Sequence, residues 1–177
     1  ILPGDLRLLK IWCLTKTRLI IQAATEAEAL FKEQRQIEYL LTWMNLQLRL
    51  GDTKGLVISA RQLAAHKNAQ PNNLLWAANW VHLEDKALAR KLWKQATEKH
   101  IDENLLDLVI DLSFKLNLEK EARSYIQQAQ LLALEGKGPF KAVKIKEVLK
   151  LNQNWYNQVT DISQKYDNGE LPIHLVT

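Results

Sequence analysis

The stretch NNLLWAANWVHLEDKALARKLWKQATEK, residues 72–99, predicts two amphipathic helices that fold back on each other across the polar turn Glu84-Asp85. In the second helix Ala89, Trp93 and Ala96 recur at spacings of four and three residues. This spacing places a small, a large and a small side chain on one helical face. We therefore expect that face to pack against a neighbouring helix.

The same frame of small and large apolar residues returns along the chain with a constant 33-residue period. Its other members are Ala23, Ala27 and Leu30, then Leu56, Ala60 and Leu63, and finally Ala122, Ile126 and Ala129. A fixed period of this size is typical of stacked helical hairpins, which bury a continuous core only by packing on their neighbours. The sequence therefore predicts an all-α fold of stacked antiparallel helix pairs.

The repeated unit resembles the tetratricopeptide repeat, whose second helix carries an Ala-x3-aromatic-x2-Ala pattern. Units are expected to start at Gly4, Ile37, Gln70 and Glu103, and the third unit, with Trp76, Ala77 and Trp80 in its first helix, matches the family best. The resemblance implies a right-handed solenoid over residues 1–135. A C-terminal helical cap and an extended tail are expected over residues 136–177.

Helix boundaries can be predicted for most of the chain. We expect helices over residues 36–50, 53–66, 103–116 and 119–135. Gly51 is expected to end a helix, because glycine adopts the left-handed conformation at low cost. Asn117 is expected to make the turn between two helices. Asp102 is expected to cap the third of these helices by accepting a free backbone N–H. Residues 140–151 are expected to lead into a helix over 154–167, followed by an apolar tail over 170–177.

Residues 1–34 give conflicting signals. Asp5 is a candidate N-cap for a helix with the apolar stripe Leu6, Leu9, Trp12 and Cys13. Thr25 and Glu28 form the pattern of a capping box and predict a helix that restarts at Thr25. The 33-residue register starts the same helix earlier, and the sequence leaves both possibilities open.

Composition favours a mostly helical globular protein. Apolar residues make up 47% of the chain, charged residues 25%, and glycine and proline together are only ten. The sequence has no apolar run long enough to span a membrane. The single Cys13 excludes an intramolecular disulfide, is expected to be a small buried residue, and favours a reducing compartment such as the cytoplasm. The chain begins with Ile1 and is expected to be a piece of a longer protein.

Catalytic and metal-binding patterns are missing from the sequence. The four histidines, His66, His82, His100 and His174, are too scattered for a helical pair of zinc ligands. Asp107 and Asp111 lie one helical turn apart and are interpreted either as an acid–base pair or as an ordinary surface pair. We therefore expect neither an enzyme nor a bound cofactor or metal.

The tetratricopeptide resemblance implies that the first helix of each unit lines a binding groove. Its expected lining residues are Trp12, Lys16, Asn45, Arg49, His82, Asp111 and Lys115. The basic members of this set can hold carboxylates or phosphates through charge-assisted hydrogen bonds. The alternative is a solvated basic surface near helix C-termini, where the helix dipole favours cations. The tryptophans at positions 43, 76, 80 and 93 are expected in the core.

A second basic feature is the segment 137–150. It contains Lys137, Lys141, Lys144, Lys146 and Lys150 against Glu147 alone. Such an excess attracts nucleic acid, or is an ordinary solvated helix face. The segments GPFKAVKIKEVL (138–149) and NGELPIHL (168–175) are similar to bacterial proteins in which tetratricopeptide-like repeats precede a PIN-type nuclease domain.

Two functions follow as expectations. The first is a protein–protein interaction scaffold that binds a peptide or a partner domain in the groove. The alternative is an accessory repeat domain of a nucleic-acid-processing protein that is linked to a nuclease. Neither involves a membrane, and the sequence gives no indication of the oligomeric state.

Overall fold

The computed structural model describes residues 4–134, except the side chains of residues 130, 133 and 134, and this part of the chain is helical, without strands. The chain divides into two compact units, with the boundary between Ile101 and Asp102. The first unit contains six α-helices: α1 (Gly4–Lys16), α2 (Ile20–Gln34), α3 (Ile37–Leu50), α4 (Thr53–Ala64), α5 (Pro71–Val81) and α6 (Lys86–Thr97). The second contains the short 3₁₀ helix η1 (Glu103–Leu105) followed by α7 (Leu106–Lys115) and α8 (Glu119–Leu134).

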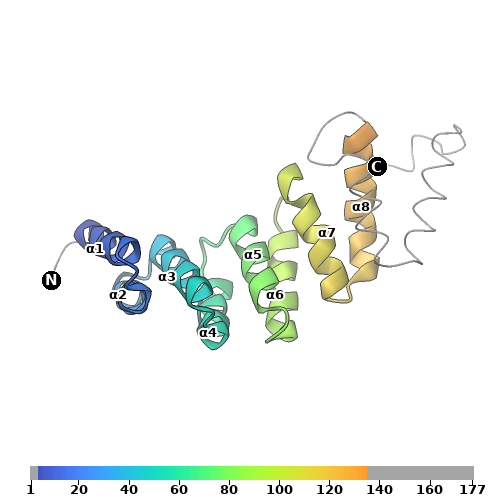
Figure 1. Ribbon diagram of the computed structural model, residues 1–177. Coiled ribbons are helices and arrows are strands. Elements are labelled where there is room, and N and C mark those ends of the chain that lie inside the picture. Colours follow the sequence, from blue (N-terminus) through green and yellow to red (C-terminus); the bar gives the residue numbers. More distant parts are fainter. Residues whose placement is uncertain (1–3, 135–177) are drawn as a thin grey trace, which may run out of the picture. The chain divides into compact units, whose positions relative to one another are not determined.

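In the first unit the six helices follow one another in sequence order (Figure 1). Each helix packs on its neighbours in the sequence, and α4 also contacts α6. Aromatic side chains take part in this packing, because the rings of Phe31 on α2 and Trp43 on α3 are stacked with their centroids 6.2 Å apart.

The even-numbered helices keep the period that the sequence predicts. They begin at Ile20, Thr53, Lys86 and Glu119, so each begins one full period after the one before it. All twelve residues of the small–large–small frame are buried, among them Trp93, which is 6% exposed, and Ala89 and Ala96, which are fully buried. The frame therefore forms the inner face of every even-numbered helix.

Three of the turns between helices share one conformation at one place in the period. Arg18, Gly51 and Asn117 all have positive φ angles, of 63°, 67° and 57°. In each case the amide of the next residue donates to the carbonyl oxygen five residues earlier, over 2.9, 3.0 and 2.8 Å. This is the Schellman geometry, which satisfies carbonyls that a helix end leaves free. Gly51 confirms the predicted helix end, and Asn117 confirms the predicted turn.

Aspartates begin two of the even-numbered helices. Asp52 accepts the amide of Gly55 and Asp85 accepts the amide of Leu88, both over 2.9 Å. Gly55 lies close against the side chains of Asp52 and Gln47, so a Cβ at this position would require the ends of these side chains to shift. The same Gln47 accepts a buried hydrogen bond of 2.7 Å from Ser59, which joins α3 to α4.

In the second unit α7 and α8 pack on each other. Asp102 accepts the amide of Asn104 over 2.8 Å and caps η1, as predicted. The first turn of the expected 103–116 helix is a 3₁₀ turn, and α7 proper begins at Leu106. Four apolar residues of α7 and the three frame residues of α8 are buried: Leu106, Val109, Ile110, Leu112, Ala122, Ile126 and Ala129.

The structure contradicts the sequence-based expectations for Asp5, Cys13 and Trp76, and of the two possible starts of the second helix it has the earlier one. Asp5 lies inside the first turn of α1 and is not its cap, and α2 begins at Ile20 without a capping box at Thr25. The hydroxyl of Thr25 instead donates to the Ile21 carbonyl within the same helix, over 3.0 Å. Cys13 is exposed. Trp76 is 44% exposed and Trp80 is half-buried, whereas Trp43 and Trp93 are buried as predicted. The expectations for residues 136–177 lie outside the described residues.

We predict that Trp93→Ala lowers the free energy of unfolding by about 3–5 kcal/mol, because it removes a large buried side chain and leaves a cavity. Trp12→Ala removes the same group from an exposed site and should cost well under this amount. Chemical denaturation of the two variants measures both values, and equal losses would contradict the assignment of Trp93 to the core and of Trp12 to the surface.

Candidate binding surface

The outward face of the odd-numbered helices can be located by comparing α1 with α3. On α3, which packs on both α2 and α4, Asn45 and Arg49 remain exposed. Their equivalents one period earlier are Trp12 and Lys16 on α1, and both are exposed as well. Side chains at these places therefore stay accessible even where a helix has neighbours on both sides.

At three other places in the period, the side chain is exposed on α1 but buried on α3. Leu6, Lys10 and Cys13 are exposed, while the α3 residues at the same places, Tyr39, Trp43 and Leu46, are buried. In the described part of the first unit α3 packs on both α2 and α4, whereas α1 packs mainly on α2. Cys13 is exposed because of this difference in neighbours. It does not lie at the outward places that Trp12 and Lys16 share with Asn45 and Arg49.

Trp12 is the most exposed tryptophan of the first unit, with 57% of its surface accessible. The Lys16 ammonium group lies 5.5 Å from the centroid of its ring. A cation at this distance from an indole face is attracted by the ring quadrupole. The two residues therefore form one amphipathic contact point on α1.

On α5 the outward face is displaced by one residue relative to the predicted register. The register places the start of this helix at Gln70, but α5 begins at Pro71. Ala78 lies one 33-residue period after Asn45, and it is fully buried although Asn45 is exposed. The outward places on this helix and the turn after it belong to Trp76, Asn79 and Leu83, the last of which is 85% exposed. His82 comes one residue before Leu83; it is half-buried, and its Nδ1 lies 2.7 Å from the Asn79 carbonyl oxygen.

The displacement moves Trp76 away from the buried place that Trp43 has on α3 and into the place of Thr42, which is half-buried there. The ring of Trp76 lies next to that of Trp80, with the centroids 6.3 Å apart.

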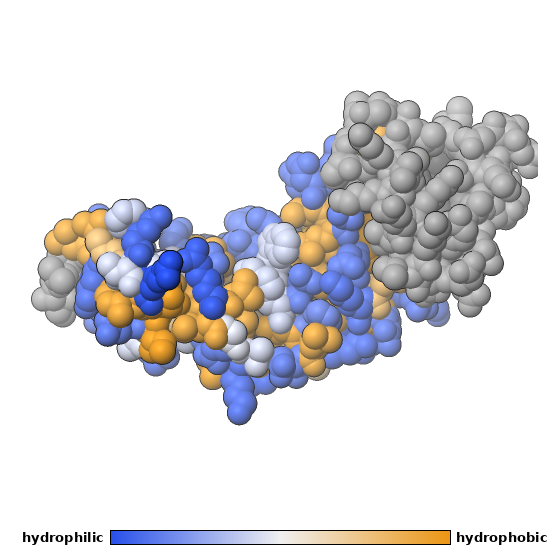
Figure 2. All heavy atoms as spheres, in the orientation of Figure 1, coloured by the Kyte–Doolittle hydropathy of each residue, from blue (hydrophilic) through white to orange (hydrophobic). Residues whose placement is uncertain are grey.

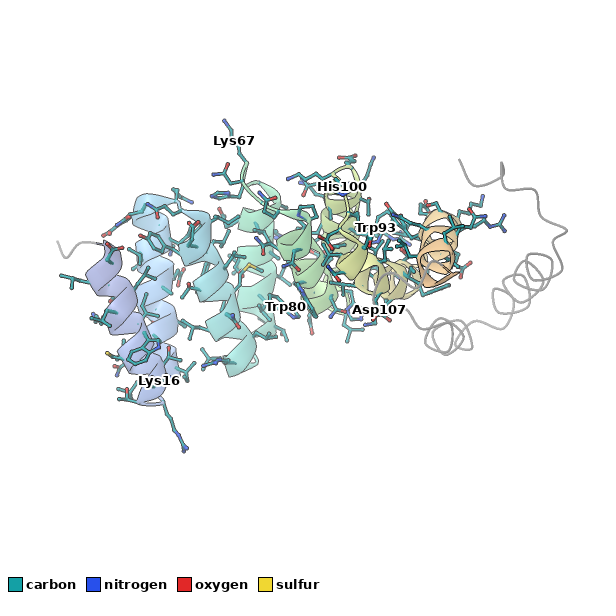
Figure 3. The ribbon with its side chains drawn as sticks, turned by 90° about the horizontal axis from the view of Figure 1, so that it is seen from above. Lys16, Lys67, Trp80, Trp93, His100 and Asp107 are labelled. Carbon is teal, nitrogen blue, oxygen red and sulfur yellow. The ribbon has the colours of Figure 1, made fainter. Side chains whose placement is uncertain are left out.

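Figure 3 shows Lys16 and Trp80 along the same edge of the first unit, and Lys67 along the opposite edge. We use the name front surface for Trp12, Lys16, Asn45, Arg49, Trp76 and Asn79. On the near side of the first unit, Figure 2 shows hydrophobic and hydrophilic residues interspersed.

The two predicted groove residues of the second unit, Asp111 and Lys115, form an ion pair with each other over 2.6 Å, one helical turn apart on α7. This pairing agrees with the interpretation of Asp111 as an ordinary surface carboxylate. The described residues hold no group of three or more metal-ligating side chains. The predicted basic segment, Lys137 to Lys150, lies outside the described residues.

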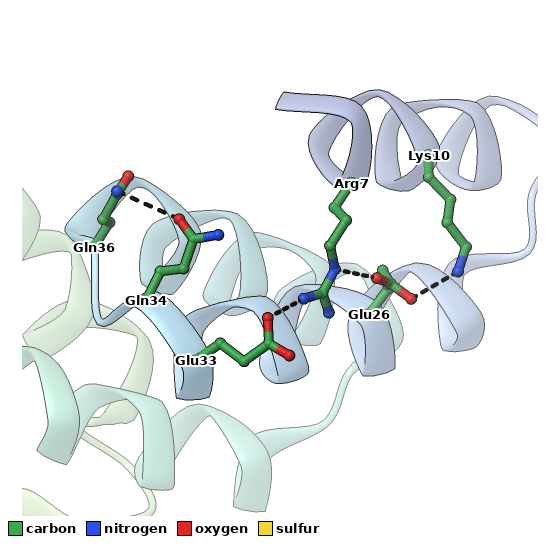
Figure 4. Close-up of polar contacts among 6 residues, drawn as sticks. All are labelled: Arg7, Lys10, Glu26, Glu33, Gln34 and Gln36. Atoms are coloured by element: carbon green, nitrogen blue, oxygen red, sulfur yellow. Dashed lines mark hydrogen bonds and ion pairs between the residues drawn. The ribbon is translucent and has the colours of Figure 1, made fainter. Parts of the chain in front are cut away.

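An ion-pair network fixes α1, and with it Trp12 and Lys16, on α2 (Figure 4). Arg7 is only 8% exposed; its Nε donates to Glu26 over 2.6 Å, and its Nη1 donates to Glu33. The other carboxylate oxygen of Glu26 accepts from Lys10 over 2.8 Å. Hydrogen bonds from Lys10 and Arg7 lower the pKa of Glu26. A buried charge needs such partners, because its desolvation is otherwise costly.

Sequence reasoning overlooked a second group of charges, on the even-numbered helices. Lys54 and Arg61 on α4, and Arg90, Lys91 and Lys94 on α6, are all exposed. The available signal was the charge of each helix taken separately, since neither α4 nor α6 contains an acidic residue.

Comparison of the chain with known protein families, with curated proteins and with solved structures gives no match. None of the described helices has the length and apolar character that crossing a membrane requires. The function must therefore be inferred from the surfaces themselves.

The Glu26 network gives a pH-dependent prediction. Because folding lowers the pKa of Glu26, its contribution to stability is complete above the pKa of an unfolded glutamate, about 4.3, and disappears as the pH falls through the lower folded value. Glu26→Gln should cost about 1.5–3 kcal/mol at neutral pH, the range for a hydrogen bond to a charged group. The difference from wild type should shrink below about pH 4.

Urea denaturation of both proteins across this pH range measures the difference. Glu28→Gln is the matched control, because Glu28 pairs with the exposed Lys32 on the same helix. A difference that stays constant down to the lowest pH, or an equal loss in the control, would contradict a stabilising role for the network.

Proposed function

We propose that the chain is a protein-interaction module: a right-handed solenoid of stacked antiparallel helix pairs that resembles tetratricopeptide repeats and binds an extended peptide on the front surface. Three features support the repeat architecture. The even-numbered helices begin at one constant interval, the frame residues are all buried, and three turns share the Schellman geometry at the same place in the period.

The observation that carries the proposed binding role is the exposure of Trp12 and Trp76 at outward places on α1 and α5. Large aromatic side chains are usually at least half-buried, and exposed ones are enriched where proteins bind partners. Between them α3 presents the amide of Asn45, which can bond to a peptide backbone. The front surface thus combines two aromatic anchors with an amide donor and acceptor.

The charges of the front surface indicate the character of the peptide. Lys16 and Arg49 are its charged members, and both are cations. An arginine guanidinium presents paired donors that match a carboxylate. The ligand that fits best is therefore an extended segment with acidic residues beside apolar ones, which would rest on Trp12 and Trp76.

We predict that Arg49→Ala weakens binding of a fluorescein-labelled peptide rich in leucine and glutamate by about tenfold, or 1.4 kcal/mol. The free energy of unfolding should change by no more than about 0.5 kcal/mol, since Arg49 is exposed. Fluorescence anisotropy measures the affinity, and the same peptide with glutamine in place of glutamate tests the requirement for negative charge.

Lys67→Ala is the matched control, because it removes one exposed cation from the opposite edge of the first unit (Figure 3). Trp12→Ala combined with Trp76→Ala tests the aromatic anchors and should also weaken binding. Equal losses in Arg49→Ala and Lys67→Ala, or undiminished binding by the double tryptophan variant, would contradict the proposed site.

A further inference from the structure

The outward faces of α4 and α6 carry a concentration of positive charge. The two helices contain six cations and no acidic residue: Lys54 and Arg61 on α4, and Lys86, Arg90, Lys91 and Lys94 on α6. All six are exposed. We use the name basic face for these six residues, which belong to different helices from the front surface.

The two helices lie side by side, so their charges form one surface. Gln95 of α6 donates to the Ala64 carbonyl of α4 over 3.0 Å, and Arg61 of α4 donates to Asp85, the cap of α6, over 2.9 Å. Arg61 and Lys94 occupy equivalent places, since each lies eight residues after the start of its helix. Their side chains therefore point outward in the same direction from neighbouring helices.

The helix dipole favours Arg61 and Lys94, which lie in the last turns of α4 and α6, but helix stability does not account for the other cations. Lys86 is the first residue of α6 and Lys54 the second of α4. The helix dipole disfavours cations at these N-terminal places. Arg90 and Lys94 are four residues apart and Lys91 and Lys94 three apart, spacings at which like charges repel. By contrast, α2 pairs its Lys32 with Glu28 over 2.7 Å.

Within α4, α6 and the residues that flank them in the sequence, the acidic residues lie only at the helix ends. Asp85 is engaged by Arg61 and by the Leu88 amide. Asp52 caps α4, Glu84 lies in the turn before α6, and Glu98 follows α6. Lys91 and Lys94 thus lie in a helix, α6, that contains no acidic residue of its own.

We propose that the basic face binds the phosphate backbone of nucleic acid. Four of its six cations are lysines, which bind phosphates as flexible point charges and lack the planar fork that arginine offers a carboxylate. Lys86 to Lys94 spans about 12 Å of helix axis. This length corresponds to about three or four phosphates at about 3.4 Å per phosphate of one strand. The only large exposed apolar residue on α4 or α6 is Ile58, which leaves the face without the several apolar anchors that a membrane-binding helix uses.

This inference goes beyond the proposed peptide site and is tested separately from it. The probes are fluorescein-labelled single-stranded DNA of mixed sequence and the leucine–glutamate peptide described above. The test variant is Lys91→Gln with Lys94→Gln, and the matched control is Lys32→Gln with Lys67→Gln, which removes the same charge from exposed sites outside the basic face. Circular dichroism and thermal unfolding establish that each variant is folded.

We expect the test variant to bind DNA at least tenfold more weakly than wild type, while the control changes little. The slope of log affinity against log salt should become shallower by about 1.4, which is about 0.7 for each of two lost phosphate contacts to a single strand. Peptide binding should be unchanged in the test variant, and DNA binding should be unchanged in Arg49→Ala.

The proposal is overturned if wild type shows no salt-dependent DNA binding, or if the test and control variants lose equal affinity for DNA. It is also overturned if the test variant loses affinity for the peptide and not for DNA, because the basic face would then bind an acidic protein. None of these results alters the measurement of Arg49→Ala with the peptide, so the two proposals fail independently.

Discussion

The structure depends on small side chains at the inner faces of the even-numbered helices. Seven alanines of the repeated frame are fully buried: Ala23, Ala27, Ala60, Ala89, Ala96, Ala122 and Ala129. Alanine allows a neighbouring backbone to approach closely, while the larger frame residue beside it fills the remaining space at native packing density. Because the frame returns at a constant period, the same close approach is available to each even-numbered helix, and the even-numbered helices start at the same interval.

This constraint on the inner faces determines which side chains face outward. In the first unit the odd-numbered helices present Trp12, Asn45 and Trp76, and the even-numbered helices α4 and α6 present only cations among their charged residues. The front surface and the basic face lie on different helices, so their side chains can differ in chemistry while the packing of the inner faces stays the same. A repeated scaffold can thus carry two independent binding surfaces, since substitution on an outward face leaves the core frame unchanged.

Much of the fold was predictable from local residue chemistry. Gly51 indicated a helix end because glycine adopts positive φ readily, and Asn117 indicated a turn. Arg18 takes the same conformation at the equivalent place, but arginine gives no such signal, so the start of α2 was not evident. The Thr25-x2-Glu28 pattern competed with the repeat register. The register gave the correct answer because the buried frame of Ala23, Ala27 and Leu30 extends the helix toward Ile20.

The candidate site was predictable only in part. Trp12, Lys16, Asn45 and Arg49 were located by a register that α1 and α3 share. Trp76 was assigned to the core because a constant period was assumed, whereas α5 begins one residue later than that period requires, at Pro71, and its outward face moves with it. Cys13 was expected to be buried because a free cysteine usually behaves as a small buried hydrophobic residue. Both errors concern tertiary packing, which residue spacing within one helix does not report.

The central claim, that alanines at the frame positions control helix packing, is tested most directly by comparing Ala89→Leu with Ala87→Leu. Both substitutions enlarge an alanine of α6, but Ala89 is fully buried and Ala87 is exposed. We predict that Ala89→Leu lowers the free energy of unfolding by about 1–3 kcal/mol through overpacking, and that Ala87→Leu changes it by no more than about 0.5 kcal/mol. Urea denaturation provides both values. Equal effects of the two substitutions, or a stabilising effect of Ala89→Leu, would contradict the account.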